Sequence, residues 1–327
     1  MKFEQFGLDR RIVDAIAGAG YTLPTPIQHQ AIPKVLEGRD VMGLAQTGTG
    51  KTAAFILPII QRLIKGPQRR VRALVVVPTR ELAEQIYQTS IELGKNTRVR
   101  CVAVYGGVSK KSQVSRLRKG VELVIACPGR LLDLVGDGDI DLRQIEVLVL
   151  DEADRMCDMG FMPDIRRIIK ILPSKRQTLC FAATMPEDIR RLTHKILKDP
   201  VRIQVGQISP VKSVAHALYP VPNTLKKSLL FAILEQTPTG RVLIFTRTKY
   251  RARNLARDLV KRGYRAEALQ GNMSQNKRQR AIDGFRGKKY DILVATDVAS
   301  RGIDVLDISH VINYDIPDAT DTYIHRI

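Results

Sequence analysis

The sequence from residue 45 to residue 52 is Ala45-Gln46-Thr47-Gly48-Thr49-Gly50-Lys51-Thr52. A run typical of a short buried strand precedes it at residues 40–44, and residues 53–64 have the apolar spacing of a helix. The glycines are therefore expected on a strand-to-helix turn, where backbone N–H groups and the helix dipole favour an anion. Gly48 and Gly50 allow backbone conformations that a side chain would block. The stretch predicts a phosphate-binding loop.

Two side chains of this loop have the chemistry to hold a triphosphate. Lys51 can reach the β- and γ-phosphates, and the Thr52 hydroxyl can bind Mg²⁺. The first position is Ala45, where the strict pattern has glycine. From these residues alone, an ordinary glycine-rich turn is the alternative.

An acidic sequence follows a second buried run. Residues 147–150 are continuously apolar, as expected of a strand buried on both faces of a parallel sheet, and Asp151-Glu152-Ala153-Asp154 comes next. Open α/β sheets bind ligands at the carboxyl ends of their strands. We therefore expect Asp151 to bind Mg²⁺ and Glu152 to orient or deprotonate water. Together with the phosphate loop, these carboxylates predict a nucleoside triphosphatase.

The net charge of the chain is strongly positive. It contains 53 Lys and Arg residues against 33 Asp and Glu residues, a formal net charge of +20. Such a surface attracts polyanions, of which nucleic acid is the commonest. An anionic membrane is the rival partner, but we find no apolar run of spanning length and no basic amphipathic anchor. Plain solvated surface is the remaining alternative.

The cysteines and the N-terminus favour a cytoplasmic protein. Cys101, Cys127, Cys157 and Cys180 are too far apart for a zinc knuckle or a Cys-x-x-Cys pair, and most lie in or beside apolar runs. Residues 1–6 contain no apolar signal region.

Strand-like and helical runs alternate along the chain, which implies mostly parallel sheets covered by helices on both faces. A length of 327 residues favours two domains. We predict an N-terminal domain at residues 1–205, a linker at 206–212 and a C-terminal domain at 213–327. The predicted strands are 73–77, 99–104, 123–126, 147–150 and 178–182, then 241–246, 265–269, 291–295 and 311–314.

Short motifs occur in a fixed order over essentially the whole chain. They include Gly20-Tyr21 with Pro24-Thr25-Pro26-Ile27-Gln28, the phosphate loop, Asp151-Glu152-Ala153-Asp154, Ala182-Ala183-Thr184 and Ala295–Asp304. On these motifs the chain resembles the DEAD-box ATP-dependent RNA helicases, most of all the bacterial RhlE-type group. The resemblance implies two tandem RecA-like α/β domains and the use of ATP, Mg²⁺ and RNA.

The motif at residues 20–28 resembles the family's Q motif, with Phe3 as its upstream aromatic, and implies ATP in preference to GTP. Gln28 would read the N6/N7 edge of adenine, and Phe3 or Tyr21 would supply an aromatic face. The implied nucleotide-binding residues are Phe3, Tyr21, Thr25, Gln28, Ala45, Gln46, Thr47, Gly48, Thr49, Gly50, Lys51, Thr52 and, at the ribose, Asp304. The implied catalytic residues are Lys51, Asp151, Glu152, Asp154 and Thr184, with Thr52 and Asp151 as metal ligands.

Further motifs resemble the family's RNA-backbone contacts. The residues that they imply are Pro78, Thr79, Arg80, Gly106, Gly107, Gly129, Arg130, Arg247, Thr248, Gly271 and Thr296. Because such contacts fall on sugar and phosphate, we expect sequence-independent, salt-dependent binding of a single strand or short duplex. RNA is expected in preference to DNA. We expect a monomer without membrane contact, acting on RNA, with ribosomal or RNA-decay assemblies as further candidate partners.

Several positions depart from the family pattern. Cys127 replaces a threonine, which puts one phosphate contact in question, and Gln270 stands where histidine is usual. Ala182 replaces the serine of the Ser-Ala-Thr motif, so we expect Ala182→Ser to change unwinding per ATP more than ATP turnover. The last motif begins at His325-Arg326. Its arginine fingers would lie beyond residue 327, so we expect a fragment, with an incomplete second domain, that hydrolyses ATP poorly.

Two rival functions stay open beside an RNA helicase. One is a DNA-translocating helicase of the same superfamily, and the other is a non-catalytic RNA clamp or assembly platform. A Rossmann dehydrogenase is disfavoured, because the loop carries Gly-Lys-Thr and lacks Gly-x-Gly-x-x-Gly.

Overall fold

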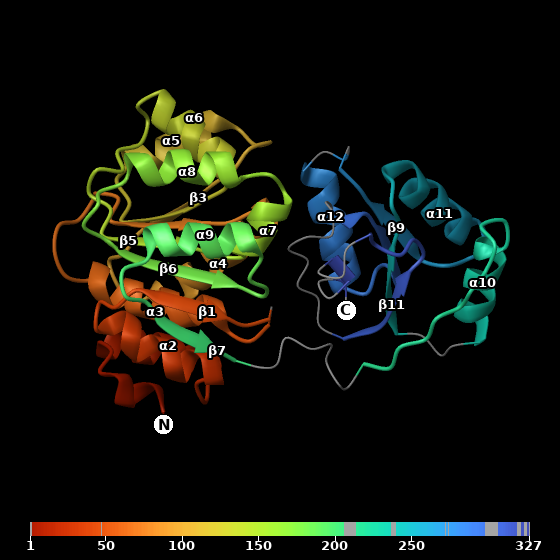
Figure 1. Ribbon diagram of the computed structural model, residues 1–327, viewed down its shortest axis with the longest axis horizontal. Helices are drawn as coiled ribbons and strands as arrows, with labels where there is room; N and C mark the ends of the chain where they lie inside the picture. Colours follow the sequence, from red (N-terminus) through yellow and green to blue (C-terminus); the bar gives the residue numbers. More distant parts are fainter. Residues whose placement is uncertain are drawn as a thin grey trace. The chain divides into compact units, whose positions relative to one another are not determined.

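The computed structural model describes residues 2–46, 48–205, 214–236, 240–271, 273, 275–297, 307–318, 322, 323 and 326. The chain divides into two compact units, Met1–Ile208 and Ser209–Ile327 (Figure 1). The predicted linker at residues 206–212 lies outside the described residues.

The described part of the first unit contains a seven-stranded sheet in the order β3-β4-β2-β5-β6-β1-β7. Every neighbouring pair is parallel. The strands are β1 (Val41–Leu44), β2 (Ala73–Val76), β3 (Cys101–Val104), β4 (Leu123–Ala126), β5 (Val147–Leu150), β6 (Gln177–Ala182) and β7 (Val201–Gln204). The edge strand β7 is absent from the predictions made above.

Helices cover both faces of this sheet, as predicted (Figure 1). One face carries the short 3-10 turn η1 (Phe3–Phe6) and helices α1 (Arg10–Gly18), α2 (Pro26–Leu36), α3 (Lys51–Leu63) and α4 (Arg80–Gly94). The other face carries α5 (Lys110–Arg118), α6 (Pro128–Gly136), α7 (Ala153–Asp158), α8 (Met162–Ile171) and α9 (Glu187–Ile196).

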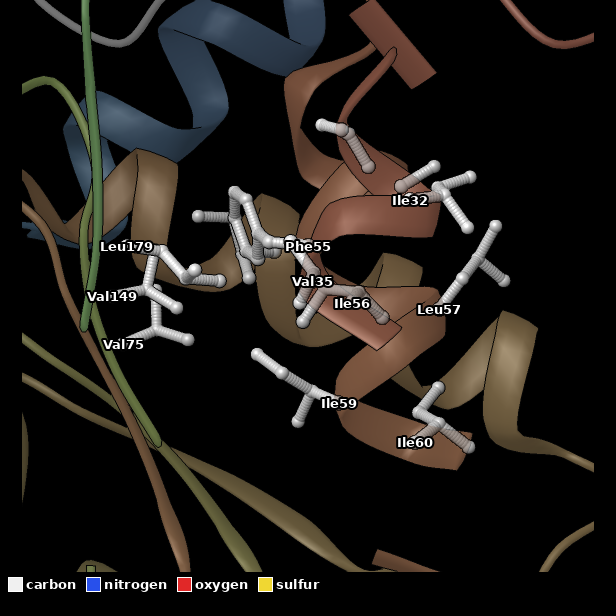
Figure 2. Packing of buried hydrophobic residues seen from close by; sticks show 14 of the residues in the cluster. Ile32, Val35, Phe55, Ile56, Leu57, Ile59, Ile60, Val75, Val149 and Leu179 are labelled. Atoms are coloured by element: carbon white, nitrogen blue, oxygen red, sulfur yellow. The ribbon is translucent and has the colours of Figure 1, made fainter. Parts of the chain in front are cut away.

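The strands of this sheet are apolar throughout because successive side chains enter opposite cores. In β5, Val147 and Val149 join the core under α1 to α4, whereas Leu148 and Leu150 join the core under α5 to α9. Figure 2 shows Val149 beside residues of the neighbouring strands, facing Phe55 of α3. Both faces of the central strands are therefore fixed by packing.

A glycine at the centre of β1 sets the approach of α3. A Cβ on Gly43 would lie 2.4 Å from the Phe181 ring of the adjacent strand β6, so only glycine leaves room for that ring. Phe181 in turn packs against Phe55 at 5.4 Å between ring centroids, and both side chains are fully buried. The start of α3, and with it the phosphate loop, is held against the sheet by this aromatic pair.

The described part of the second unit contains a four-stranded parallel sheet in the order β11-β8-β10-β9. Its strands are β8 (Arg241–Phe245), β9 (Ala266–Leu269), β10 (Ile292–Ala295) and β11 (Ile308–Asn313). Helices α10 (Lys226–Gln236) and α11 (Lys249–Lys261) pack on one face, and α12 (Gln275–Arg286) packs on the other. The predicted fold class, two α/β units with parallel sheets between helices, is confirmed.

Candidate active site

All described strands of the first unit run in the same direction, so their carboxyl ends lie at one edge of the sheet. We call this the carboxyl edge. Every loop that leaves the strands between β3 and β1 at this edge carries a motif singled out in the sequence. In sheet order these are Gly106-Gly107 after β3, Cys127–Arg130 after β4, Pro78–Arg80 after β2, Asp151–Asp154 after β5, Ala183-Thr184 after β6 and Ala45–Thr52 after β1. The predicted RNA-facing loops thus occupy one half of the edge and the predicted nucleotide loops the other.

The phosphate loop has the backbone that its glycines predict. Gly48 has φ +79° and Gly50 has φ +91°, both in the left-handed region that favours glycine. Lys51 is the first residue of α3 and is 7% exposed, and its Nζ donates a hydrogen bond to the Ala45 carbonyl at 2.8 Å. The Thr49 hydroxyl donates to the Gln46 carbonyl at 2.7 Å. The loop is thereby closed on itself, with a buried ammonium group inside; Thr47 lies outside the described residues.

Gln28 is bound to the phosphate loop by its side-chain amide. It is 1% exposed; its Oε1 accepts from the Thr25 backbone N–H at 3.0 Å, and its Nε2 donates to the Gly50 carbonyl at 3.1 Å. The first turn of α2 and the loop are therefore joined. Reading of adenine by Gln28 stays a prediction, and it requires the amide to exchange these partners. The Thr25 hydroxyl oxygen is buried at the same place, where Thr25 and Gln28 form a capping box at the start of α2.

The two predicted aromatic faces differ in their accessibility. Phe3 is 3% exposed, and its ring packs edge-on against Phe6 at 6.1 Å and Tyr21 at 6.2 Å between centroids. Tyr21 is only partly buried, and burial raises the pKa of its hydroxyl. The structure thus leaves ring surface at Tyr21 and buries the ring of Phe3 in the core.

Asp151 is a buried acid beside a buried cation. It is 2% exposed, and its Oδ1 accepts from the Glu152 backbone N–H at 2.9 Å. Burial raises the pKa of this carboxyl to about 6, although the charge of Lys51 acts in the opposite direction. A further positive charge beside Asp151 would lower this pKa and stabilise the ionised carboxylate, which fits the hard cation Mg²⁺ with the Thr52 hydroxyl as a second ligand. Among the described residues, no three His, Cys, Asp or Glu side chains form a metal cluster.

Glu152 has an unusual backbone for a residue with a side chain. Its φ is +52°, it is 5% exposed, and its Oε2 accepts from the Arg155 guanidinium at 2.8 Å. Backbone strain of this kind persists only where the surroundings hold it in place, and it gathers at functional sites. The predicted base is therefore held in a fixed position by its neighbour in the first turn of α7.

Asp154 connects the loop after β5 with the loop after β6. Its Oδ2 accepts from the backbone N–H groups of Ala183 at 3.0 Å and Thr184 at 2.7 Å and from the Thr184 hydroxyl at 3.0 Å. Its Oδ1 accepts from the Arg155 N–H at 3.0 Å. Ala182 is fully buried in the core under α5 to α9, so a serine hydroxyl there would enter apolar surroundings.

The three predicted RNA-facing loops of the first unit are packed on one another. A Cβ on Gly107 would collide with the Arg80 guanidinium, and Gly107 has φ +80°. Arg130 donates to the Gln113 Oε1 at 3.1 Å, and Gln113 donates to the carbonyl of Tyr105, the residue before Gly106. The loops after β3, β2 and β4 are therefore fitted together.

Two helices begin among these loops and present backbone N–H groups there. Thr79 caps α4, accepting from the Leu82 N–H at 3.3 Å, and Cys127 precedes α6. Burial, reinforced by the charge of Glu81, raises the pKa of the Cys127 thiol to about 12. The thiol is therefore neutral and supplies at most a weak hydrogen bond. Pro78 is buried and Gly129 is exposed at the same edge.

The predicted RNA-facing residues of the second unit also follow carboxyl ends of adjacent strands. Arg247 and Thr248 follow β8, Gly271 follows β9 and Thr296 follows β10. Thr248 caps α11 through its hydroxyl, Gly271 is exposed, and Thr296 is 8% exposed. Arg247 pairs with Asp318 at 2.8 Å. The predicted ribose contact, Asp304, lies outside the described residues.

Sequence reasoning missed a buried cation at this edge of the second unit. Arg326 is 6% exposed and makes a bidentate ion pair with Asp297 at 2.6 and 2.7 Å. It also donates to Asn313 at 2.7 Å and lies over the Phe245 ring at 4.7 Å. The sequence signalled Arg326 only as the start of a motif; of its partners, Phe245 is in β8, Asn313 is in β11 and Asp297 follows β10.

A comparison with protein-family models matches residues 25–192 to the DEAD/DEAH box helicase model and residues 225–327 to the helicase conserved C-terminal domain model. The chain belongs to the DEAD-box helicase family.

Relatives and solved structures of DEAD-box helicases cover this chain almost completely. The DEAD-box ATP-dependent RNA helicase RhpA of Helicobacter pylori is 44% identical over 326 residues, which are 99% of this chain and 66% of RhpA. The RNA helicase CrhR of Synechocystis is 41% identical over 99% of this chain and 66% of CrhR. The chain thus spans about two thirds of the length of these curated relatives.

Among solved structures, Saccharomyces cerevisiae Dbp5 bound to RNA and ADP BeF3 is similar, with a TM-score of 0.89 and 30% identity. The similarity covers 99% of this chain and 85% of that one. The predicted family is confirmed by these comparisons. The RhlE-type subgroup stays a prediction.

Proposed function

We propose that this protein is an ATP-dependent RNA helicase, which couples binding and hydrolysis of ATP to RNA binding and local separation of short duplexes. The observation that carries the proposal is the single carboxyl edge of the first sheet. It holds the phosphate loop after β1 and the RNA-facing loops after β3, β4 and β2, with the acids after β5 between them. The relatives' description as RNA helicases, and Dbp5 bound to RNA and ADP BeF3, support the same function.

The nucleotide half of the edge supplies charge and orientation. Lys51 would exchange its bond to the Ala45 carbonyl for phosphate oxygens, since its ammonium group is already desolvated inside the loop. Thr52 and Asp151 would hold Mg²⁺, which neutralises negative charge on the phosphates when it is bound. Adenine bound at Gln28 would affect the phosphate loop, because the Gln28 amide is hydrogen-bonded to the Gly50 carbonyl.

The acidic loop after β5 would carry the chemical step. Glu152 is held by Arg155 and would orient the attacking water or accept its proton. Asp154 would transmit a change at this loop to Ala183 and Thr184 through its hydrogen bonds at 2.7 to 3.0 Å. That connection gives strand separation a physical link to the state of the nucleotide.

RNA would be held through its backbone. The loops offer N–H donors at the helix starts after Thr79 and Cys127 and positive charge at Arg80 and Arg130, and such groups suit phosphate oxygens. Binding would therefore be indifferent to sequence and weaken steeply with salt. None of the helices in the described residues is long and apolar enough to cross a bilayer. We propose a cytoplasmic monomer.

The decisive experiment measures ATP hydrolysis with and without RNA and the unwinding of a short duplex. The complete protein should hydrolyse ATP faster when RNA is added, and Lys51→Ala should abolish both activities. Lys175→Ala, at an exposed lysine, is the matched control and should leave them unchanged. Unaltered turnover in Lys51→Ala would exclude the proposal.

Two further measurements separate the rival functions. Equal stimulation by DNA and RNA would favour a DNA-translocating helicase. Glu152→Gln tests the RNA clamp, since a clamp should keep its biological activity when hydrolysis is lost, whereas a helicase should not.

A further inference from the structure

The opposite edge of the first sheet, where the parallel strands begin, is strongly basic. We call it the amino edge. Residues 61–72, which lead into β2, contain five Arg and Lys residues and no acid. Residues 95–100 lead into β3 and contain three, and residues 116–119, before β4, contain another three, again without an acid. Because β3, β4 and β2 are neighbours in the sheet, the positive charges of the three segments gather side by side.

The three segments are joined around one buried acid. Glu122 is 1% exposed, and its carboxylate accepts from the backbone N–H groups of Arg69 and Arg100. It also accepts from the Arg100 guanidinium at 3.2 Å. Gly120 is packed against Arg69 so closely that a Cβ would lie 2.5 Å from the Arg69 Cβ. This acid is directed inward and used by backbone groups, so it does little to neutralise the side chains outside.

Several cations at the amino edge therefore remain available to a partner. Lys65, Arg69, Arg98 and Lys119 are exposed, and within the part of the chain that the structure describes none of them pairs with a carboxylate. Solvated cations are ordinary when acids are interspersed among them. Here the three segments contain no acid, and the bordering acids Asp9, Asp139 and Glu146 each pair with another arginine. The charges of the remaining cations therefore add to a positive potential.

A cavity of about 220 Å³ opens beside Arg98. Its lining combines the apolar side chains of Leu63, Ile64 and Val99 with Gln68, Arg11, Arg98 and Glu122. Arg11 is paired with Asp9, and the Glu122 carboxylate accepts from backbone N–H groups, so Arg98 supplies the cation for a ligand. Apolar surface beside guanidinium groups suits a nucleotide, whose base has apolar faces and whose phosphate is anionic.

We propose that the amino-edge basic surface, formed by Lys65, Arg69, Arg70, Arg98 and Lys119, binds the sugar-phosphate backbone of RNA outside the helicase site. Cations from the segments before three adjacent strands would contact a polymer with one negative charge per nucleotide. The proposal rests on the proposed function for the identity of the polyanion. A long substrate would contact the carboxyl edge with one segment and the amino edge with another, whereas a short strand would occupy only the helicase site.

The test compares RNA strands of 7 and 40 nucleotides in the presence of a non-hydrolysable ATP analogue. The triple variant Lys65→Gln, Arg69→Gln, Arg98→Gln should bind the 7-nucleotide strand within twofold of the unchanged protein. Binding of the 40-nucleotide strand should weaken roughly tenfold, and the slope of log affinity against log salt should become shallower by about 2, as expected for three lost phosphate contacts.

The matched control removes three exposed cations from α8, the segment after it and α9, by Arg166→Gln, Lys175→Gln and Lys195→Gln. It should leave both affinities unchanged. Equal loss in the control variant, no loss in the amino-edge variant, or equal loss for both strand lengths would overturn the proposal. So would weaker binding to anionic vesicles with unchanged binding to RNA.

This test fails separately from the proposed function. If RNA does not stimulate ATP hydrolysis by the unchanged protein, the helicase activity is refuted, while length-dependent loss at the amino edge still establishes the second surface. If stimulation is normal and the two variants behave alike, the helicase activity stands and the second surface is refuted.

Discussion

Replacing Asp154 with Asn should weaken the connection between the loops after β5 and β6. In the described part of the chain the carboxylate accepts three hydrogen bonds at Oδ2, from Ala183 and Thr184, and one at Oδ1, from Arg155. Asn keeps one acceptor. If its oxygen occupies the Oδ2 position, three bonds lose their charged partner and the amide N–H₂ faces the Arg155 N–H. Weakened charged bonds and one unsatisfied buried donor together predict a loss of about 3 kcal/mol in the free energy of unfolding.

Thr184→Val shows how much one of these hydrogen bonds contributes to the free energy of unfolding. It removes only the hydroxyl bond at 3.0 Å and keeps the size of the side chain, so it should cost about 1.5 kcal/mol. In the Asp154→Asn background the same substitution should cost less, because the hydroxyl has already lost its charged acceptor. The two changes should therefore be non-additive by about 1 kcal/mol.

Urea unfolding followed by circular dichroism would give the global values, and hydrogen exchange would give the local one. The amides of Ala183 and Thr184 donate directly to Asp154, so their protection should fall by roughly tenfold or more in Asp154→Asn. Unchanged exchange at these two amides, or strictly additive unfolding energies, would refute the reasoning.

Three further predictions concern other parts of the two units. Gly50→Ala should lower the affinity for ADP, measured by calorimetry, by roughly tenfold, because its φ is +91° and the new Cβ would lie 2.5 Å from the Gln28 amide. Gly48→Ala is the control: its φ is also positive, but among the described residues no atom beyond its chain neighbours lies within 4 Å of the new Cβ, so it should lose less affinity. Equal losses in the two variants would contradict the proposed collision with Gln28. Burial raises the pKa of Asp151 from its usual 3.8 to about 6, so the folded protein loses stability as the pH rises from about 4 to about 6. Asp151→Asn avoids this loss and should be more stable by about 3 kcal/mol at pH 7.5, with the gain fading as the pH falls toward 4; a gain independent of pH would contradict it. Arg326→Ala should destabilise the second unit by about 3 kcal/mol in urea unfolding, because it removes the bonds of a buried guanidinium to Asp297, Asn313 and the Asp315 carbonyl; a change below about 1 kcal/mol would contradict it.

The buried strands were the part of the fold most accessible to sequence reasoning. Runs such as residues 123–126 and 147–150 are apolar on both faces, so their assignment does not depend on a partner, and β4 and β5 have these bounds. Strand β7 was missed for the opposite reason. Its burial alternates and it carries Arg202 and Gln204 on the solvent side, so its pattern is weak for an edge strand.

The site was predictable to the extent that its residues are local in sequence. The phosphate loop and the acids after β5 act through neighbouring atoms, and their backbone geometry follows from glycine and from strand ends. The contacts of Gln28 with Gly50, and of Arg326 with Asp297, join residues that are distant in the chain. No spacing rule indicates them, because they depend on how the strands are ordered.

The order of strands in the first sheet also fixes the distance between the loop after β4 and the phosphate loop after β1. From β4 to β1 the sheet advances by four strand spacings, through β2, β5 and β6, which amounts to about 20 Å at about 4.8 Å per strand. Insertions or deletions in the connecting loops can change which ligand binds after β4 or after β1, but they cannot change the distance between these two strands. A single inhibitor that reaches both ends would consequently need a rigid spacer of that length, and the same spacer should serve any protein that preserves the sheet.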